Sequence, residues 1–92
     1  MDLGGGAGVY TVPLAKKGYQ VTLADLSERL IEQAKEKVRA ESIENVVADV
    51  VNAIDLSQYP DNMFDIVLVL GPFYHLTEES ERQKCASEIR RI

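Results

Sequence analysis

Four glycines occupy five consecutive positions near the start of the chain, in the stretch "DLGGGAG" from Asp2 to Gly8. Glycine tolerates positive φ angles and lets the backbone approach a ligand closely. Between a strand and a helix, such a loop directs backbone N–H groups at whatever binds the helix N-terminus. The stretch therefore predicts a strand-to-helix turn that was selected to hold a ligand.

The hydrophobic period changes several times along the remaining sequence, and each change marks an expected element. The pattern predicts strands over residues 1–3, 20–25, 45–51 and 64–71, and helices over residues 9–17, 28–40 and 78–92. Strands that alternate with helices favour right-handed βαβ units in an open parallel sheet, here as a single α/β domain over residues 1–92. The long apolar runs at 45–51 and 64–71 are typical of strands covered on both faces.

Capping residues and apolar stripes set the expected ends and buried faces of the helices. Gly18 is a suitable terminator for the first helix, Ser27 is a good N-cap for the second, and Thr77 can cap the third. Pro13 lies close enough to the first turn of its helix to be tolerated. The last helix has an apolar stripe formed by Cys85, Ala86, Ile89 and Ile92.

Composition restricts the classes of function and partner. The formal net charge of −5 repels nucleic-acid and anionic lipid surfaces, and no local basic patch offsets it. One cysteine, Cys85, excludes an internal disulfide and fits a reducing compartment, and no Cys/His cluster suggests a metal site. No secretory leader or membrane span is recognisable, so we expect a cytoplasmic protein without nucleic-acid or membrane partners.

Two acidic residues follow the glycine loop at the ends of the next two predicted strands. Asp25 lies where a carboxylate can accept both hydroxyls of a ribose; its alternative role is to cap the helix that begins near Ser27. Asp49 interrupts an apolar strand and needs a hydrogen-bond donor. That donor is either the exocyclic amino group of an adenine or a backbone amide in the following loop.

Taken in order, "DLGGGAG", "TLADLS", "VVADVV" and "FDIVLVLGPFYHL" resemble the class I S-adenosylmethionine-dependent methyltransferases, within the small-molecule group that includes ubiquinone-biosynthesis enzymes. The resemblance covers essentially the whole chain and implies a Rossmann-like sheet with strand order 3-2-1-4. The family core has seven strands, so these residues correspond to its cofactor-binding half.

The resemblance also implies which residues hold S-adenosylmethionine. The glycine motif around the methionine and sugar portions corresponds to Asp2, Gly4, Gly6 and Gly8. Asp25 corresponds to the ribose-binding acid and Leu26 to its apolar neighbour against the adenine face. Asp49 and Val50 correspond to the pair at the adenine edge, and Leu70 and Gly71 to the end of the fourth strand beside the methionine.

Methyl transfer is an in-line displacement that needs positioning more than a dedicated catalytic residue. Tyr74 and His75 are the candidates to face the methyl acceptor, and His75 could act as a base near neutral pH. A loop histidine bonded to the backbone is an equally good interpretation. "LGPFY" loosely resembles a motif of amino methyltransferases that act on nucleic-acid bases, but Gly71 has no side chain to hold the target amine.

Two other functions stay open on the sequence. The chain could be a catalytically inactive cofactor-binding or assembly module, or an NAD-linked oxidoreductase domain. Val9 disfavours the second, because the dinucleotide fingerprint requires glycine or alanine there. Strands missing beyond the fourth leave an apolar edge at residues 66–70, so we expect a truncated chain that forms a homodimer through this edge or is marginally stable alone.

Overall fold

The computed structural model of the chain describes residues 1–69 and 78–92. Strands and helices alternate in these two ranges, as the periodicity predicts, although several elements are short. The elements are β1 (Asp2–Leu3), α1 (Thr11–Lys16), β2 (Val21–Asp25), α2 (Glu28–Ala40), β3 (Val46–Val50), β4 (Leu68–Val69) and α3 (Glu79–Arg91). None of the helices in these ranges is long and apolar enough to span a bilayer.

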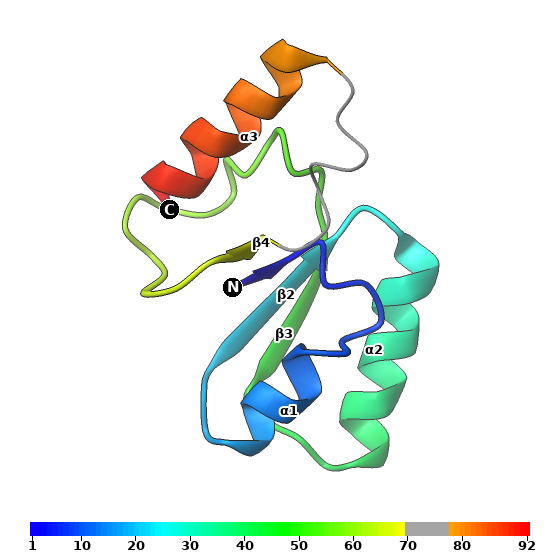
Figure 1. The fold of residues 1–92 in the computed structure, drawn as a ribbon. Coiled ribbons are helices and arrows are strands. Elements are labelled where there is room, and N and C mark those ends of the chain that lie inside the picture. Colours follow the sequence, from blue (N-terminus) through cyan, green and yellow to red (C-terminus); the bar gives the residue numbers. More distant parts are fainter. Residues whose placement is uncertain (70–77) are drawn as a thin grey trace.

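The four strands form one parallel sheet in the order β3-β2-β1-β4, which confirms the expected topology. β1 is only two residues long, yet it lies between β2 and β4. Helices α1 and α2 lie on one side of the sheet, and α3 lies on the other with the segment that follows β3 (Figure 1). Because the strands are parallel, the carboxyl ends of β1, β2 and β3 lie together at one end of the sheet, which we call its carboxyl edge.

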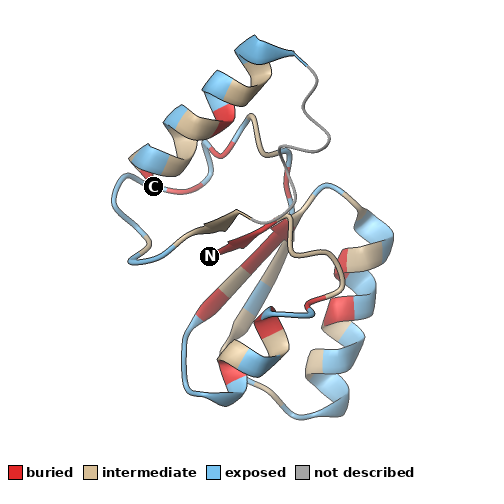
Figure 2. Cartoon of the chain, viewed as in Figure 1, coloured by how far each residue is buried: buried red, intermediate tan, exposed pale blue. Residues whose placement is uncertain are grey.

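The buried side chains form two clusters, and most buried positions lie on the sheet and on the helix faces turned toward it (Figure 2). The smaller cluster joins Leu23 to Ile31 and Ala34 of α2. The larger one joins the sheet to α3 and to the segment before β4, and consists of Met1, Leu3, Ala24, Val51, Leu56, Tyr59, Cys85 and Ile92. Of the predicted apolar stripe, Cys85 of α3 and Ile92 directly after the helix belong to the core, and Ile89 packs against it.

Helix α1 begins at Thr11, two residues later than the pattern predicts, because the chain still turns at Gly8, where φ is +87°. Pro13 is therefore the third residue of the helix, where its missing N–H has no intrahelical acceptor to lose. Gly18 ends the helix as expected: its φ is +100°, and its N–H donates to the carbonyl of Ala15.

The cap predicted for α2 is confirmed, since the Ser27 hydroxyl accepts the N–H of Leu30 at 3.3 Å. The N-cap of α3 is Glu78, whose side chain makes no capping hydrogen bond. Thr77, the residue expected in that role, lies outside the described ranges.

The expectation of strands covered on both faces is wrong for β3. Val47 and Val50, which lie on opposite faces of the strand, are both exposed, and Val47 is 57% exposed. β3 is an outer strand, so the described residues cover it incompletely. The run at 64–71 also yields only a short strand, since β4 is Leu68–Val69 and Ile66 before it is 65% exposed.

Candidate functional site

The glycine loop leaves β1 at the carboxyl edge of the sheet and returns into α1. Its course needs three residues in the left-handed region: φ is +75° at Gly4, +58° at Gly6 and +87° at Gly8. These are the alternate glycines that the sequence motif singled out, and non-glycine residues rarely adopt such angles. The Gly4 N–H donates to the Ala24 carbonyl at 2.7 Å, which fixes the start of the loop to β2.

Gly5, the additional glycine, is required for a different reason. A Cβ atom at this position would lie 2.5 Å from Cγ and Oδ2 of Asp2 and 2.5 Å from Cδ1 of Leu23. Both of those side chains are buried, so neither can move aside without disturbing the core. Gly5 thus permits the loop to fold directly over the Asp2 carboxylate.

Asp2 is the most notable polar group beneath the loop. It is 1% exposed, and its Oδ2 accepts the Thr11 hydroxyl at 2.8 Å. Its Oδ1 is buried and accepts no hydrogen bond from the residues that the structure describes. A buried oxygen without a donor is costly, which makes Asp2 the least satisfied polar group beneath the loop.

Asp25 joins the glycine loop to the start of α2. Its Oδ2 accepts the Gly6 N–H at 2.9 Å, and its Oδ1 accepts the Ser27 N–H at 2.9 Å. Asp25 therefore does orient the start of α2, which was its alternative role. The two oxygens of a carboxylate offer about four lone-pair sites, so these two backbone donors do not use all of them.

Asp49 lies at the end of β3 and bonds to a side chain rather than to the backbone amide considered as its alternative partner. Its Oδ2 accepts the hydroxyl of Tyr59 at 2.7 Å. In the described parts of the chain, no donor reaches its Oδ1. Asp49 is half-buried at the end of its strand.

The strand register sets how the two later acids lie relative to each other. Ala24 of β2 is paired with Asp49, and Asp25 is paired with Val50. Since paired residues share a face and successive residues alternate, Asp25 and Asp49 lie on opposite faces of the same sheet edge. Between them the edge carries two exposed apolar side chains, Leu26, which is 66% exposed, and Val50.

Other predicted site residues cannot be placed. Leu70, Gly71, Tyr74 and His75 lie outside the described residues. The structure thus brings together the glycine loop, Asp2, Asp25, Leu26, Asp49 and Val50, while the side of the site that faces the methyl acceptor remains a prediction.

Two participants were missed at the sequence level, namely Thr11 and Tyr59. Thr11 lies in the first turn of α1, three residues after the last glycine, and nothing in the sequence pairs it with Asp2. Tyr59 lies in the loop "SQYPDNM". An aromatic residue within so polar a loop was the available signal that this loop folds back onto the core.

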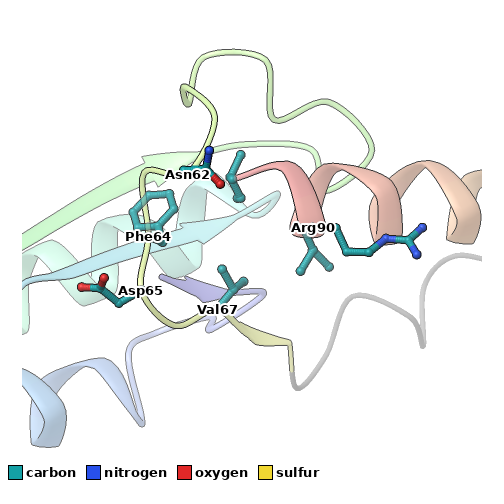
Figure 3. A pocket seen from close by; sticks show the side chains of 7 residues that line it. Asn62, Phe64, Asp65, Val67 and Arg90 are labelled. Atoms are coloured by element: carbon teal, nitrogen blue, oxygen red, sulfur yellow. The ribbon is translucent and has the colours of Figure 1, made fainter.

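A pocket of about 600 Å³ lies elsewhere, between the segment before β4 and the end of α3 (Figure 3). It is lined by Asn62, Phe64, Asp65, Val67, Ile89, Arg90 and Ile92. None of these residues belongs to the glycine loop or to the carboxyl edge of the sheet. This pocket is therefore separate from the candidate site.

Comparison with known proteins gives a consistent result. The family model described as "Methyltransferase domain" matches residues 1–92. The ubiquinone/menaquinone biosynthesis C-methyltransferase of Zymomonas mobilis is 35% identical over 92 residues, covering 100% of this chain and 36% of the relative. The tRNA 5-carboxymethoxyuridine methyltransferase of Escherichia coli is 32% identical over 69 residues, covering 74% of this chain and 26% of the relative.

Among solved structures, a SAM-dependent methyltransferase from Methanosarcina mazei is 28% identical and superimposes with a TM-score of 0.88. The match covers 98% of this chain and 44% of that structure. The chain therefore spans between a quarter and a half of the length of these relatives.

Proposed function

The chain belongs to the methyltransferase domain family, and on that basis we propose that its 92 residues form the S-adenosylmethionine-binding part of a methyltransferase that acts on a small molecule. The observation that supports this most strongly is the convergence of the glycine loop with Asp2, Asp25 and Asp49 at one edge of the sheet. In open α/β sheets, ligands bind at the carboxyl ends of the strands.

The residues at this edge fit the proposed cofactor in shape and in charge. Three carboxylates suit a sulfonium cation and an α-amino group better than they suit a pyrophosphate. The unpaired Oδ1 of Asp2 is placed for a donor from the methionine portion, and the free lone pairs of Asp25 are placed for the ribose hydroxyls. The exposed side chains of Leu26 and Val50 offer an apolar surface for the adenine ring.

The proposed contribution of these residues to the reaction is binding and orientation. S-adenosylmethionine supplies a methyl group on a good leaving group, so transfer needs an acceptor held in line rather than an elaborate catalytic apparatus. The glycine loop and Asp25 fix the cofactor, and the loop excludes water from the Asp2 side. Tyr74 and His75 remain the proposed residues that face the acceptor.

The small-molecule acceptor is supported by the relative from Zymomonas mobilis, which is named for ubiquinone and menaquinone biosynthesis. The relative named for tRNA makes RNA the second candidate. The net charge of −5 favours the first, because an RNA substrate requires a basic surface. The buried, free thiol of Cys85 is compatible with the cytoplasmic location that we propose.

Calorimetric titration with S-adenosylmethionine, S-adenosylhomocysteine and NAD tests the cofactor. We expect the first two to bind in a 1:1 complex and NAD to bind at least about tenfold more weakly, and Asp25→Ala to weaken both S-adenosyl ligands by about tenfold or more. Val47→Ala, a change at an exposed position away from this edge, serves as the matched control. Equal binding of NAD would favour the oxidoreductase interpretation, and binding without transfer to any acceptor would favour an inactive module.

We further propose that the chain forms a homodimer through the β4 edge. Within the part of the chain that the structure describes, β4 pairs with β1 alone, and the apolar side chains of Met63 and Ile66 beside it are exposed. The adjacent pocket is lined by an acid and a base, Asp65 and Arg90 (Figure 3).

Sedimentation at micromolar concentration tests the dimer. We expect a reversible dimer for the parent and a monomer for Ile66→Lys, because a charge on the apolar edge opposes pairing. Val47→Lys on the other outer strand is the control and should remain dimeric. A parent chain that is a monomer with a cooperative melt would contradict the proposal.

A further inference from the structure

The hydroxyl of Tyr59 reaches across from the loop after β3 to the carboxylate of Asp49. The donor–acceptor distance is 2.7 Å, in the normal range for a strong O–H···O⁻ hydrogen bond. It engages Oδ2 alone. In the described residues, the other oxygen of Asp49 has no donor, so the bond fixes the carboxylate while leaving one oxygen open.

Tyr59 is itself held in place by several contacts, so its hydroxyl can orient the Asp49 carboxylate. Its side chain is buried, and its ring packs edge-to-face on Phe64 with centroids 5.5 Å apart. Its backbone carbonyl accepts a hydrogen bond of 2.7 Å from Arg91 at the end of α3. The position of the hydroxyl is therefore set by the packing of α3 against the loop.

The Tyr59 hydroxyl is a donor over the whole physiological range. Burial raises its pKa, and so does the hydrogen bond to Asp49. The phenol therefore keeps its proton, and Asp49 Oδ2 always acts as the acceptor. A carboxylate oxygen is a hydrogen-bond acceptor, so the remaining oxygen of Asp49 suits a ligand group that donates a hydrogen bond.

We propose that Tyr59 is a positioning residue that orients Asp49 so that its free oxygen accepts the exocyclic amino group of an adenine, giving the site its preference for a 6-amino purine. The inference rests on the proposed cofactor but concerns a residue that is not part of the glycine motif or the strand-end acids. If Tyr59 served only the core, losing its hydroxyl would change stability and leave the choice of base unaffected.

The test compares S-adenosylhomocysteine with S-inosylhomocysteine, in which an oxo group replaces the amino group of the base. Calorimetric titration of the parent chain should show a clear preference for the adenine ligand. In Tyr59→Phe we expect this preference to narrow by about three- to tenfold, the effect of one lost hydrogen bond. Phenylalanine keeps the ring that packs on Phe64, so the fold is retained.

Two further variants separate positioning from packing. Tyr19→Phe removes the hydroxyl of an exposed tyrosine and should leave the preference unchanged. Asp49→Asn removes the negative acceptor with no loss of aromatic packing, and should narrow the preference at least as much as Tyr59→Phe. When Tyr59→Phe is added to Asp49→Asn, the preference for the adenine ligand should change by less than about twofold. The two residues act as one unit, so the second change has little left to remove.

Two results would overturn the role of Tyr59 while leaving the proposed cofactor in place. One is a Tyr59→Phe variant with the same preference for the adenine ligand as the parent. The other is a double variant in which the effects of Tyr59→Phe and Asp49→Asn on that preference are additive. A parent chain that binds S-adenosylhomocysteine without any preference over the inosine analogue would overturn it as well. A parent that binds neither ligand would contradict the proposed function itself.

Discussion

The carboxylate of Asp2 lies under the backbone of Gly5 with no space between them for a side chain. A Cβ atom at position 5 would lie 2.5 Å from Asp2 Cγ, well inside van der Waals contact. The loop and the acid therefore form a single unit, in which the Thr11 hydroxyl donates to one carboxylate oxygen and the other has no donor among the described residues.

Gly5→Ala should lower the free energy of unfolding by about 1–3 kcal/mol, the usual cost of overpacking, and should also weaken cofactor binding because Asp2 must move. Gly18→Ala is the matched control. Gly18 has φ of +100° and open space around a new Cβ, so we expect a strain cost of about 1–2 kcal/mol and unchanged binding. Urea denaturation and calorimetric titration of both variants check this, and parent-like binding by Gly5→Ala would contradict it.

The sequence allowed the prediction of the alternate glycines and of the strand-end acids, because each depends on local conformation and on strand order. The partners of those acids could not be predicted in the same way. The bonds from Thr11 to Asp2 and from Tyr59 to Asp49 depend on how the helix and the loop pack after folding. No local pattern specifies such contacts.

At the level of elements, α3 is joined to the loop after β3 by a compact set of charged contacts. The Arg91 guanidinium donates to the carbonyls of Leu56 and Tyr59, and to the carboxylates of Asp61 and Glu88. Glu88 in turn accepts the N–H of Leu56 at 3.0 Å. These contacts stabilise the loop that carries Tyr59.

The contact between α3 and the loop should be pH-dependent. Hydrogen bonds from Arg91 hold the pKa of Glu88 below its ordinary value of 4.5. Because the folded pKa is the lower one, its stabilising contribution is complete above pH 4.5 and is lost as the pH falls through the folded value. Urea denaturation from pH 6 to pH 3 should therefore show a shallower loss of stability in Glu88→Gln than in the parent.

Glu44→Gln is the control for that experiment, since Glu44 is exposed and accepts no hydrogen bond in the described parts of the chain. Its profile should follow the parent's. A Glu88→Gln profile that also follows the parent's would show that the contact with Arg91 adds nothing to stability.

Helix α2 and strand β2 were the most predictable elements. A serine cap and a clear helical period define α2, and β2 is an inner strand of the sheet, between β3 and β1. The bounds of β3 were predicted to within one residue at each end, but its burial was not, and β4 is much shorter than predicted. Their apolar runs suggested covered strands, but whether a strand is covered depends on what packs over it, and Val47 and Ile66 are exposed.

At the scale of the whole molecule, a short parallel sheet carries the candidate site at its carboxyl edge. Within the described residues, the outer sides of β3 and β4 pair with no further strand. The strand order was predictable from the alternation of strands and helices together with the family resemblance. The acidic charge of the chain and the three carboxylates at the site agree with a cationic ligand. The matched relatives are about two to three times as long as this chain. Comparisons over their full length are therefore needed to find the residues that select the methyl acceptor.

The central claim is that S-adenosyl ligands bind at the carboxyl edge of β1, β2 and β3. Backbone amide shifts recorded by NMR during titration with S-adenosylhomocysteine test it most directly. We expect the largest changes at Gly4 to Gly8, at Asp25 and Leu26, and at Asp49 and Val50, and little change at the pocket beside Phe64 and Ile89. Saturable binding that shifts the amides of that pocket, and leaves the glycine loop unchanged, would contradict the account.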